Sequence, residues 1–468
     1  MSENSSQPAS WSDLLSARNL LRSLALTGGI GLQAINIYIV ATVLPTVVQD
    51  IGGLAYYAWN TTLYVVASIV GSVLATRSVQ SLGARTAYLL ALAIFCVGAI
   101  ACALAPTMFW MLAGRTLQGI GGGLLFALAY ALIRVIFEER LWSRVMALVS
   151  GVWGGATLLG PAIGGIFAQG GHWRWAFLAV LPVAAALALI VIGQLGGKSA
   201  LHGVAGKIPF GKISLLVASV LIISVASLSS QLRWNVAGIV LGLALVIWMM
   251  RLDHNASVRL MPSGAYRLST QLGAIYACMA LLIIGISTEV FIPYFLQIIH
   301  GHTPLVAGYM TAFMSFGWTT ASLLGSGRSG MAADRMIRYG PMLSFGSLLV
   351  LMLITPQVQW LNNDFGVVLY CALLAGVGFG IGLGWPHLSI RVFNSARPGE
   401  ETLAASAITT VQLYATALAA ALAGVIANSA GITDPGGVAG AQNAALWLFG
   451  LFALGPALAV LLAPRILR

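Results

Sequence analysis

The stretch that decides the fold reads LAGRTLQGIGGG (Leu112–Gly123), and GGATLLGPAIGG (Gly154–Gly165) follows one apolar run later. Arg115 keeps its charge in an apolar run, because a guanidinium is not deprotonated in proteins, so it should face a partner or a polar cavity. The glycines allow helix backbones to approach closely, and Pro161 removes one helix hydrogen bond among them. Together these residues predict closely packed, mobile membrane helices around a polar interior.

The composition of the whole chain also indicates a membrane protein. The 468 residues are 59% hydrophobic and only 7% charged, with a mean hydropathy of +0.93, whereas soluble domains carry about 25% charged residues. The apolar runs are long and unbroken, and lipid offers no partners to free backbone groups, so the spans should be helices. The net charge of +11 comes from basic residues in short loops between the runs, which argues against nucleic-acid binding.

The apolar runs predict fourteen transmembrane helices, because a span needs roughly 20 apolar residues. Their approximate ranges are 24–47, 55–76, 86–105, 108–133, 145–169, 175–195, 213–230, 234–250, 271–298, 304–325, 340–356, 365–390, 402–428 and 443–463. The seventh and eighth ranges are among the shortest, and without this pair the count is twelve.

The distribution of basic residues predicts that both ends of the chain lie in the cytoplasm. Of the 23 Lys and Arg residues, all except Arg115, Arg174 and Arg233 then fall in cytoplasmic segments, as the positive-inside rule requires. Removing a single span would destroy this asymmetry, whereas removing the seventh and eighth together would not. An even number of spans is therefore predicted.

An internal repeat divides the predicted helices into two halves. RSVQSLGAR (Arg77–Arg85) follows the second span and GMAADRMIRYG (Gly330–Gly340) follows the tenth, and each is a short polar turn with glycine and arginine. Two related six-helix halves with an inserted helix pair explain this spacing. The predicted divisions are a cytoplasmic tail at 1–23, a first half at 24–196, a linker with two extra helices at 197–270, a second half at 271–464 and a tail at 465–468.

Several motifs together resemble the fourteen-helix drug:proton antiporter branch of the major facilitator superfamily, over nearly the whole chain. They are IVATVLPTVVQDIGG (Ile39–Gly53), RTLQGIGGG (Arg115–Gly123), GPAIGG (Gly160–Gly165), HWRWAFL (His172–Leu178) and the segment that begins at Gly330. The resemblance implies a major facilitator fold in which Arg115 is the buried arginine often linked to proton translocation. It also implies an antiporter motif at Gly160, Pro161, Gly164 and Gly165, and gating loops with Gln80, Gly83, Arg85, Asp334 and Arg335.

Two positions depart from the pattern of that family. An aspartate is common in the first helix where this chain has Asn36, and an acid is usual near the glycine of the first gating loop where it has Gln80. The first span therefore lacks a protonatable acid. The coupling site must lie elsewhere, or coupling differs from the family pattern.

Glu289 is the only one of the 12 acidic residues that lies inside a predicted span, within LLIIGISTEVFIPYFLQ (Leu281–Gln297). A carboxyl group held within a membrane can take up and release a proton, as a transporter relay needs. The helix directions put Glu289 in the outer half of its span and Arg115 about two turns from an outer end. We expect Glu289 and Arg115 to carry proton coupling; the alternatives are a structural glutamate and a fixed charge that orders helix packing.

Polar and aromatic side chains inside the spans are candidates for lining a substrate cavity, because amphipathic rings suit bulky organic ligands. The candidates are Asn36, Trp59, Asn60, Tyr64, Gln118, Trp153, Tyr294, Trp318 and Gln412, with Tyr130, Gln297, Trp385 and Tyr414 as further members. Each of them could instead pack in the core or anchor at the membrane interface.

Other titratable and glycine-rich features favour packing or linker roles. His387 lies near the inner end of a span, and His300 and His302 form an outer loop in which metal binding is not expected. GGKS (Gly196–Ser199) lacks the earlier glycine and the strand of a phosphate loop, so ATP-driven transport is disfavoured. The four cysteines lie in apolar runs without a CxxC motif. No metal site, cofactor or enzyme active site is predicted.

The leading hypothesis is a proton-coupled secondary transporter of the bacterial cytoplasmic (inner) membrane, which exports amphipathic organic compounds or drugs by alternating access. Its partners would be the small-molecule substrate, protons and the lipid bilayer, and it would act as a monomer. The alternative is a dedicated exporter or uniporter for one metabolite, lipid or siderophore, which the asparagine at position 36 motivates. A receptor-like protein without transport is a third class, and the lack of any sizeable soluble domain argues against it.

Overall fold

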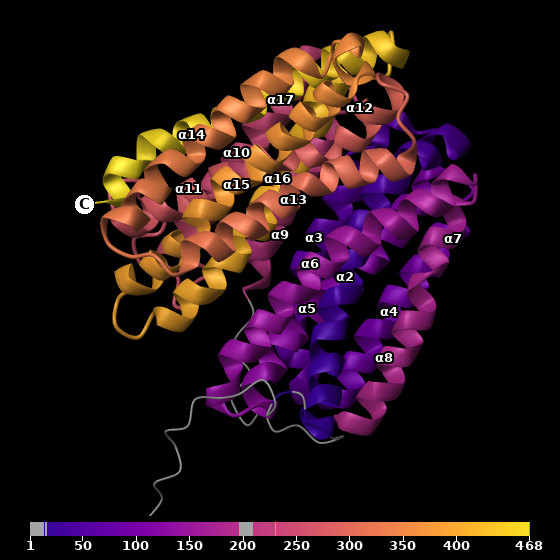
Figure 1. The fold of residues 1–468 in the computed structure, drawn as a ribbon. Coiled ribbons are helices and arrows are strands. Elements are labelled where there is room, and N and C mark those ends of the chain that lie inside the picture. Colours follow the sequence, from indigo (N-terminus) through magenta and orange to yellow (C-terminus); the bar gives the residue numbers. More distant parts are fainter. Residues whose placement is uncertain (1–13, 15, 196–208, 230, 468) are drawn as a thin grey trace, which may run out of the picture. The chain divides into compact units, whose positions relative to one another are not determined.

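The computed structural model describes residues 14–467 except 15, 196–208 and 230, and this part of the chain is helical without a strand. Figure 1 shows long helices joined by short turns. The all-α fold predicted from the apolar runs is confirmed. The predicted linker segment GGKS (Gly196–Ser199) lies outside the described residues.

The first of two compact units contains residues 1–43 and 67–206. Its helices are α4 (Ala84–Ala103), α5 (Met108–Ile136), α6 (Glu139–Gln169), α7 (Trp173–Leu178) and α8 (Val180–Gln194), with most of α2 (Ala17–Ile51) and α3 (Trp59–Leu82). Glycines bring α4 and α5 into backbone contact. A Cβ at Gly98 would lie 2.4 Å from the backbone nitrogen of Gln118, and one at Gly121 would lie 2.5 Å from that of Phe95. Small residues are what membrane helices use for such close packing.

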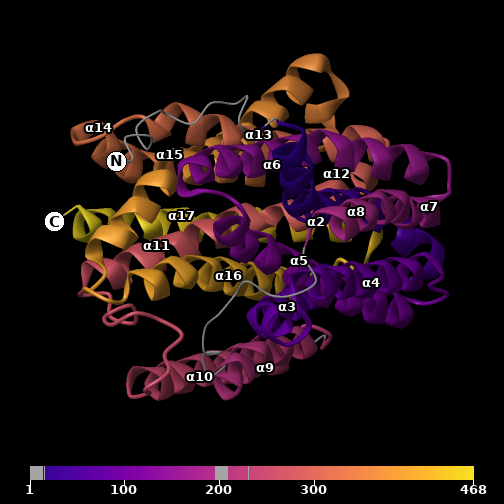
Figure 2. The ribbon, with the colours of Figure 1, turned by 90° about the horizontal axis from the view of Figure 1, so that it is seen from below.

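The second unit contains residues 44–66 and 207–468. Its elements are η1 (Leu54–Tyr56), α9 (Phe210–Ala226), α10 (Leu232–His254), α11 (Gln271–Ile286), η2 (Ser287–Val290), α12 (Ile292–Ile298), α13 (Pro304–Ser326), α14 (Met331–Ile354), η3 (Val358–Asn362), α15 (Asp364–Ser395), α16 (Glu401–Ser429) and α17 (Gly437–Ile466). Helices α9 and α10, the predicted inserted pair, lie side by side, and α9 packs on α16 (Figure 2).

Every predicted span corresponds to helical structure among the described residues. Among the described residues, twelve helices are long and apolar enough to cross a membrane, and α13 is not one of them. Helix α9 is apolar but has only 17 residues, fewer than the roughly 20 that a perpendicular span needs. The total of fourteen spans and the cytoplasmic termini therefore stay predictions.

The span predicted at 271–298 is present as a candidate span, and its helix is interrupted. Helix α11 ends at Ile286, the short 3₁₀ turn η2 carries Glu289, and α12 begins at Ile292. Pro293 explains the interruption. It has no N–H to donate to the carbonyl of Glu289 four residues earlier, and its ring crowds that carbonyl. The hydropathy of the segment does not reveal the break, because most residues around it are apolar or small.

The two polar turns predicted at 77–85 and 330–340 are almost entirely helical, which corrects their reading as loops. Helix α3 continues to Leu82 and α4 begins at Ala84, so Gly83 alone makes the turn. Its φ of 81° lies in the left-handed region that glycine adopts readily. Gly330, with φ of 57°, plays the same part immediately before α14. The repeated feature is thus a glycine with positive φ immediately before the following helix, alone in the first turn and as the last of four residues, 327–330, in the second.

Candidate functional site

Glu289 has an unusual position in the second unit. Its side chain is half-buried in η2, between the buried Thr288 and Val290. Within the described part of the chain it has no hydrogen-bond or ion-pair partner. Because Pro293 cannot donate to it, the backbone carbonyl of Glu289 also lacks its normal helix bond. The break therefore offers a carboxyl group and a carbonyl oxygen from one residue.

Aromatic rings pack beside this break. Tyr57, at the turn before α3, is 1% exposed. Its ring stacks on Phe291 with the centroids 4.8 Å apart and meets Tyr294 edge-on at 5.4 Å. Among the described residues its hydroxyl has no partner. Sequence reasoning selected Tyr294 but missed Tyr57, although the polar ring at the start of an apolar run was a visible signal.

The turn that carries Tyr57 is fixed within the second unit by one amide. Asn428 of α16 donates through Nδ2 to the carbonyl of Ala55 in η1 at 3.0 Å and to that of Ser227 at 2.9 Å. A primary amide has two N–H groups, so it can serve both acceptors. Asn428 thereby ties η1 and the end of α9 to the same helix.

Three buried polar side chains form a relay in the first unit. Arg115 is 2% exposed, and Asn36 and Gln118 are fully buried. Arg115 Nη1 donates to Gln118 Oε1 at 2.7 Å, and Gln118 Nε2 donates to Asn36 Oδ1 at 3.2 Å. Three of the residues singled out from the sequence are therefore brought together, two of them from α5 and one from α2.

The guanidinium fixes the direction of this relay. Arginine has only donors, so Gln118 must turn its oxygen to Arg115 and its nitrogen to Asn36. Asn36 must then accept with its oxygen, and its Nδ2 is left without a partner among the described residues. None of the three side chains titrates near neutral pH. The relay holds a positive charge but exchanges no proton.

The antiporter-motif glycines pack α6 against α2 in the first unit. A Cβ at Gly160 would lie 2.3 Å from the Cβ of Tyr38, and one at Gly164 would lie 2.9 Å from the carbonyl oxygen of Ile39. Pro161 and Gly165 are buried in the same stretch. The close approach is possible only because these positions carry no side chain.

The predicted gating residues Asp334 and Arg335 are adjacent in the sequence but have different surroundings in the structure. Asp334 forms an ion pair with Arg391 of α15, whereas Arg335 is exposed. Adjacent residues of a helix point about 100° apart, so only Asp334 can face α15. The gating role of Asp334 and Arg335 stays a prediction, and in this arrangement Asp334 is paired with Arg391.

The corresponding residues of the first unit have other partners. Arg85 donates through Nε to the carbonyl of Leu195 at 2.7 Å, at the end of α8. Gln80 is half-buried within α3, close to Gly83. The hydrogen bond from Arg85 to the carbonyl of Leu195 therefore joins the start of α4 to the end of α8.

The remaining candidates are spread over both units. The rings of Trp318 and Trp385 lie with their centroids 5.0 Å apart. The hydroxyl of Tyr414 lies 2.9 Å from Ser219 Oγ, so it joins α16 to α9. Asn60, Tyr64 and His387 are buried, Trp59, Tyr130, Trp153 and Gln297 are half-buried, and Gln412 is exposed.

The two loop histidines lie between α12 and α13. His300 Nε2 is 2.9 Å from the carbonyl oxygen of Thr355. Burial lowers the pKa of both His300 and His302, because the charged imidazolium loses hydration. The described residues contain no group of three or more His, Cys, Asp or Glu side chains that could hold a metal ion.

Comparison with known proteins places this arrangement in a family. The family model of the Major Facilitator Superfamily matches residues 26–420. A probable multidrug-efflux transporter of Mycobacterium tuberculosis is 38% identical over 440 residues, which cover 92% of each chain. Multidrug resistance protein 3 of Bacillus subtilis is 27% identical over 387 residues, which cover 80% of this chain and 73% of that protein.

Solved structures share the fold at low sequence identity. A POT family transporter in complex with 5-aminolevulinic acid has a TM-score of 0.68 and 15% identity, with 96% of this chain and 97% of that chain covered. A D-xylose-proton symporter has a TM-score of 0.62 and 12% identity, with 95% and 97% covered. With the family model and the Mycobacterium relative in agreement, the chain belongs to the Major Facilitator Superfamily.

Proposed function

We propose that this chain is a proton-coupled secondary transporter that exports amphipathic organic compounds by alternating access. The observation that carries the proposal is the unpartnered carboxyl group of Glu289 in an interrupted helix. Interrupted membrane helices place polar backbone and side-chain groups at the substrate and ion sites of secondary transporters. The names of the Mycobacterium and Bacillus relatives support drug efflux as the direction and substrate class.

The proposed coupling follows from the chemistry of one carboxyl group. Ionised Glu289 attracts a cationic or strongly polar substrate group, and protonated Glu289 does not. Proton and substrate therefore exclude each other at this position, which is the requirement for exchange. The rings of Tyr57, Phe291 and Tyr294 supply apolar faces for the rest of an amphipathic ligand.

The relay of Arg115, Gln118 and Asn36 has a different role in this proposal. Because it exchanges no proton, it supplies a constant positive charge in the first half while Glu289 titrates in the second. The transporter would lie in the bacterial cytoplasmic membrane, with both termini inside, as two six-helix halves with α9 and α10 inserted. We propose the monomer as the functional form.

A Glu289→Gln variant tests the coupling. We expect substrate binding to persist for neutral compounds, while substrate-driven proton release is lost because the amide cannot exchange a proton. The measurement is drug-induced proton release in proteoliposomes with an imposed pH gradient. Asp364→Asn is the matched control, since Asp364 is an exposed acid at the start of α15. Proton release that is unchanged in Glu289→Gln would overturn the assignment.

The non-titrating relay favours one alternative, a dedicated exporter or uniporter for a single compound. Such a carrier would move few members of a panel of chemically unrelated dyes, and its flux would not respond to the pH gradient. A multidrug antiporter would move several of them, each with a gradient-dependent rate. The same proteoliposomes separate the two functions.

A further inference from the structure

The segment 255–270, which joins α10 to α11, is held by a buried acid. Asp253, in the last turn of α10, is fully buried. It accepts hydrogen bonds from the backbone nitrogens of Leu260 at 2.8 Å and Met261 at 3.1 Å. The hydroxyl of Tyr266 donates to it at 2.7 Å. One carboxylate therefore organises the whole segment.

The charge of Asp253 is compensated within the inserted pair. Lys212 of α9 forms an ion pair with it at 2.7 Å, and the same ammonium group donates to the carbonyl of Val258. Burial and, after it, the hydrogen bond to Asp253 raise the pKa of Tyr266, so this phenol stays a neutral donor. Asp253 is thus paired and contributes no free charge to the surface.

A second acid fastens the same segment to α16. Glu400 accepts from Ser263 twice, from its backbone nitrogen at 2.8 Å and from its hydroxyl at 2.7 Å. Arg259 Nη1 donates to Ser263 Oγ at 2.7 Å and lies 3.7 Å from Glu400 Oε1. Burial alone raises the pKa of Glu400, but the bonds from Ser263 and the nearby arginines hold it below its usual value. Arg259 is therefore compensated by Glu400.

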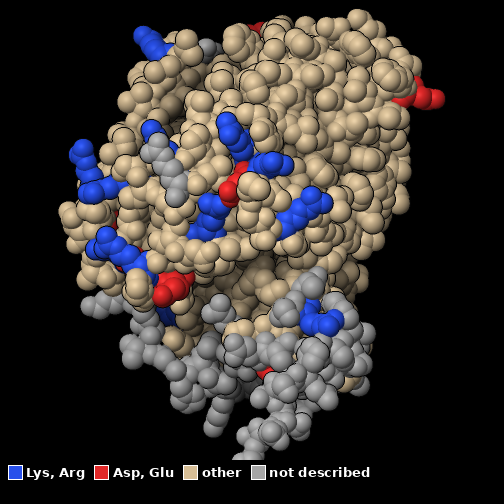
Figure 3. Space-filling view, turned by 60° about the vertical axis from the view of Figure 1, so that its left-hand side comes forward, with Lys and Arg blue, Asp and Glu red and all other residues tan. Residues whose placement is uncertain are grey.

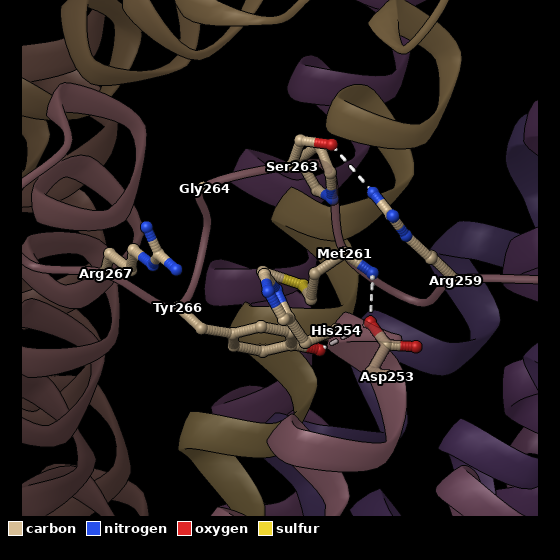
Figure 4. Close-up of a pocket in the computed structure, with 9 residues that line it drawn as sticks. Asp253, His254, Arg259, Met261, Ser263, Gly264, Tyr266 and Arg267 are labelled. Atoms are coloured by element: carbon tan, nitrogen blue, oxygen red, sulfur yellow. Dashed lines mark hydrogen bonds between the residues drawn. The ribbon is translucent and has the colours of Figure 1, made fainter. Parts of the chain in front are cut away.

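The segment encloses a pocket that retains one uncompensated cation. Its lining includes Asp253, His254, Arg259, Tyr266 and Arg267, and Figure 4 shows their side chains around it. With Asp253 and Arg259 paired elsewhere, the free charge belongs to Arg267. The guanidinium of Arg267 and the ring of His254 have no hydrogen-bond or ion-pair partner in the described part of the chain.

The helix that leads into the pocket is apolar and exposed. On α10, Ile247 is 52% exposed, Trp248 is 54% exposed and Leu252 is 45% exposed. In a membrane, this surface faces acyl chains, and the pocket follows directly at the end of the helix. Figure 3 shows basic side chains gathered around a few acidic ones on one face of the molecule. A basic pocket next to a lipid-facing helix is the arrangement that binds anionic headgroups.

We propose that this pocket binds the phosphate headgroup of an anionic phospholipid, with Arg267 and His254 as donors and α10 as the surface for its acyl chains. The proposal rests on the cytoplasmic orientation proposed above, but not on proton coupling by Glu289. A soluble phosphate compound would use the same donors, yet it would gain nothing from the apolar face of α10. The bound lipid would fasten the inserted pair to the second half.

The test compares two arginines at the same end of α10. Full-length protein in detergent is titrated with phosphatidylglycerol, and bound lipid is counted by native mass spectrometry. Arg267→Gln should weaken binding about fivefold, the factor expected for one cation near an anionic headgroup. Arg251→Gln is the control, because Arg251 is an exposed cation on α10 that does not line the pocket. His254→Ala removes the second proposed donor at an exposed position, and it should weaken phosphatidylglycerol binding as well.

Three results would overturn the proposal. The first is an equal loss of phosphatidylglycerol in Arg251→Gln and Arg267→Gln, which would indicate diffuse surface charge. The second is equal binding of phosphatidylcholine, which carries no net charge. The third is inorganic phosphate that binds as tightly as the lipid and displaces it, which would make the ligand a soluble one. Proton release by the Arg267→Gln variant, measured separately, shows whether transport itself is intact.

Discussion

The amide group of Asn36 cannot take up or release a proton, whereas the carboxyl group of an aspartate at the same position could. An aspartate there would offer Gln118 the same acceptor oxygen but would titrate, whereas the amide leaves an unpartnered Nδ2 in the described structure. The sequence revealed the substitution, and it predicted the loss of a proton site in the first span. The link to Arg115 through Gln118 could not be read from it, because helix α2 and helix α5 approach each other only in the folded chain.

An Asn36→Asp variant should give the first unit a titrating acid. The new carboxyl group would be buried, which disfavours its ionised form, and would lie close to the guanidinium of Arg115, which favours that form, so both protonation states are accessible. We expect the number of protons exchanged per substrate to rise in this variant. The measurement is the pH gradient that stops net flux at a fixed substrate gradient. Asn36→Ser is the non-titrating control, and an identical stoichiometry in Asn36→Asp and wild type would contradict the expectation.

At the scale of single elements, hydropathy predicted the helices well and their interruptions poorly. The break at Glu289 depends on Pro293 and on one missing hydrogen bond, which a window of apolar residues averages away. The short turns at Gly83 and at residues 327–330 were read as longer loops, because polar residues at helix ends resemble loop residues. The glycines predicted that some helices pack closely, but they did not predict which helices contact each other.

The contact between α13 and α15 gives a test of that packing. A Cβ at Gly378 would lie 1.7 Å from the carbonyl oxygen of Met314, so Gly378→Ala must push the helices apart. We expect it to lower the free energy of unfolding by about 1–3 kcal/mol. Gly346→Ala is the matched control, because a Cβ at Gly346 in α14 meets no described atom within 4 Å. It should raise stability by about 0.5–1 kcal/mol.

Thermal unfolding in detergent, followed by fluorescence, distinguishes the two alanines. Opposite shifts of Tm are expected for Gly378→Ala and Gly346→Ala. Equal shifts would mean that the glycines act through helix propensity alone and that the close contact of α13 with α15 is unimportant.

For the whole molecule, the apolar runs and the basic residues were sufficient to predict an all-helical membrane protein, and the motifs that resemble the major facilitator superfamily predicted the family that the comparisons show. The contacts that hold distant segments together were not predictable. Ser263 and Glu400 are 137 residues apart, and both lie in what reads as ordinary polar loop. Tyr57 likewise contacts Phe291 only because the fold brings the turn before α3 next to η2.

The Glu400 contact predicts how the second unit responds to acid. The pKa of Glu400 is depressed in the folded protein, so its contribution is fully present above about pH 4.3, the unfolded-state value. It is lost as the pH falls through the lower folded-state value. The protection of residues 255–270 against hydrogen exchange, taken relative to the intrinsic rate at each pH, should therefore fall in strongly acidic solution. Glu400→Gln should show that lower protection already at pH 7, and the exposed Glu401→Gln should not.

Helix α6 contains glycines that have no close packing contact among the described residues. A Cβ at Gly151, Gly154 or Gly155 would meet no described atom within 4 Å, unlike one at Gly160 or Gly164. Glycine in a helix interior costs about 0.5–1 kcal/mol relative to alanine. In this structure, the three glycines lower the stability of the helix without allowing a close helix contact. Because Gly151, Gly154 and Gly155 have no side chains, another helix could approach this part of α6 to backbone contact distance.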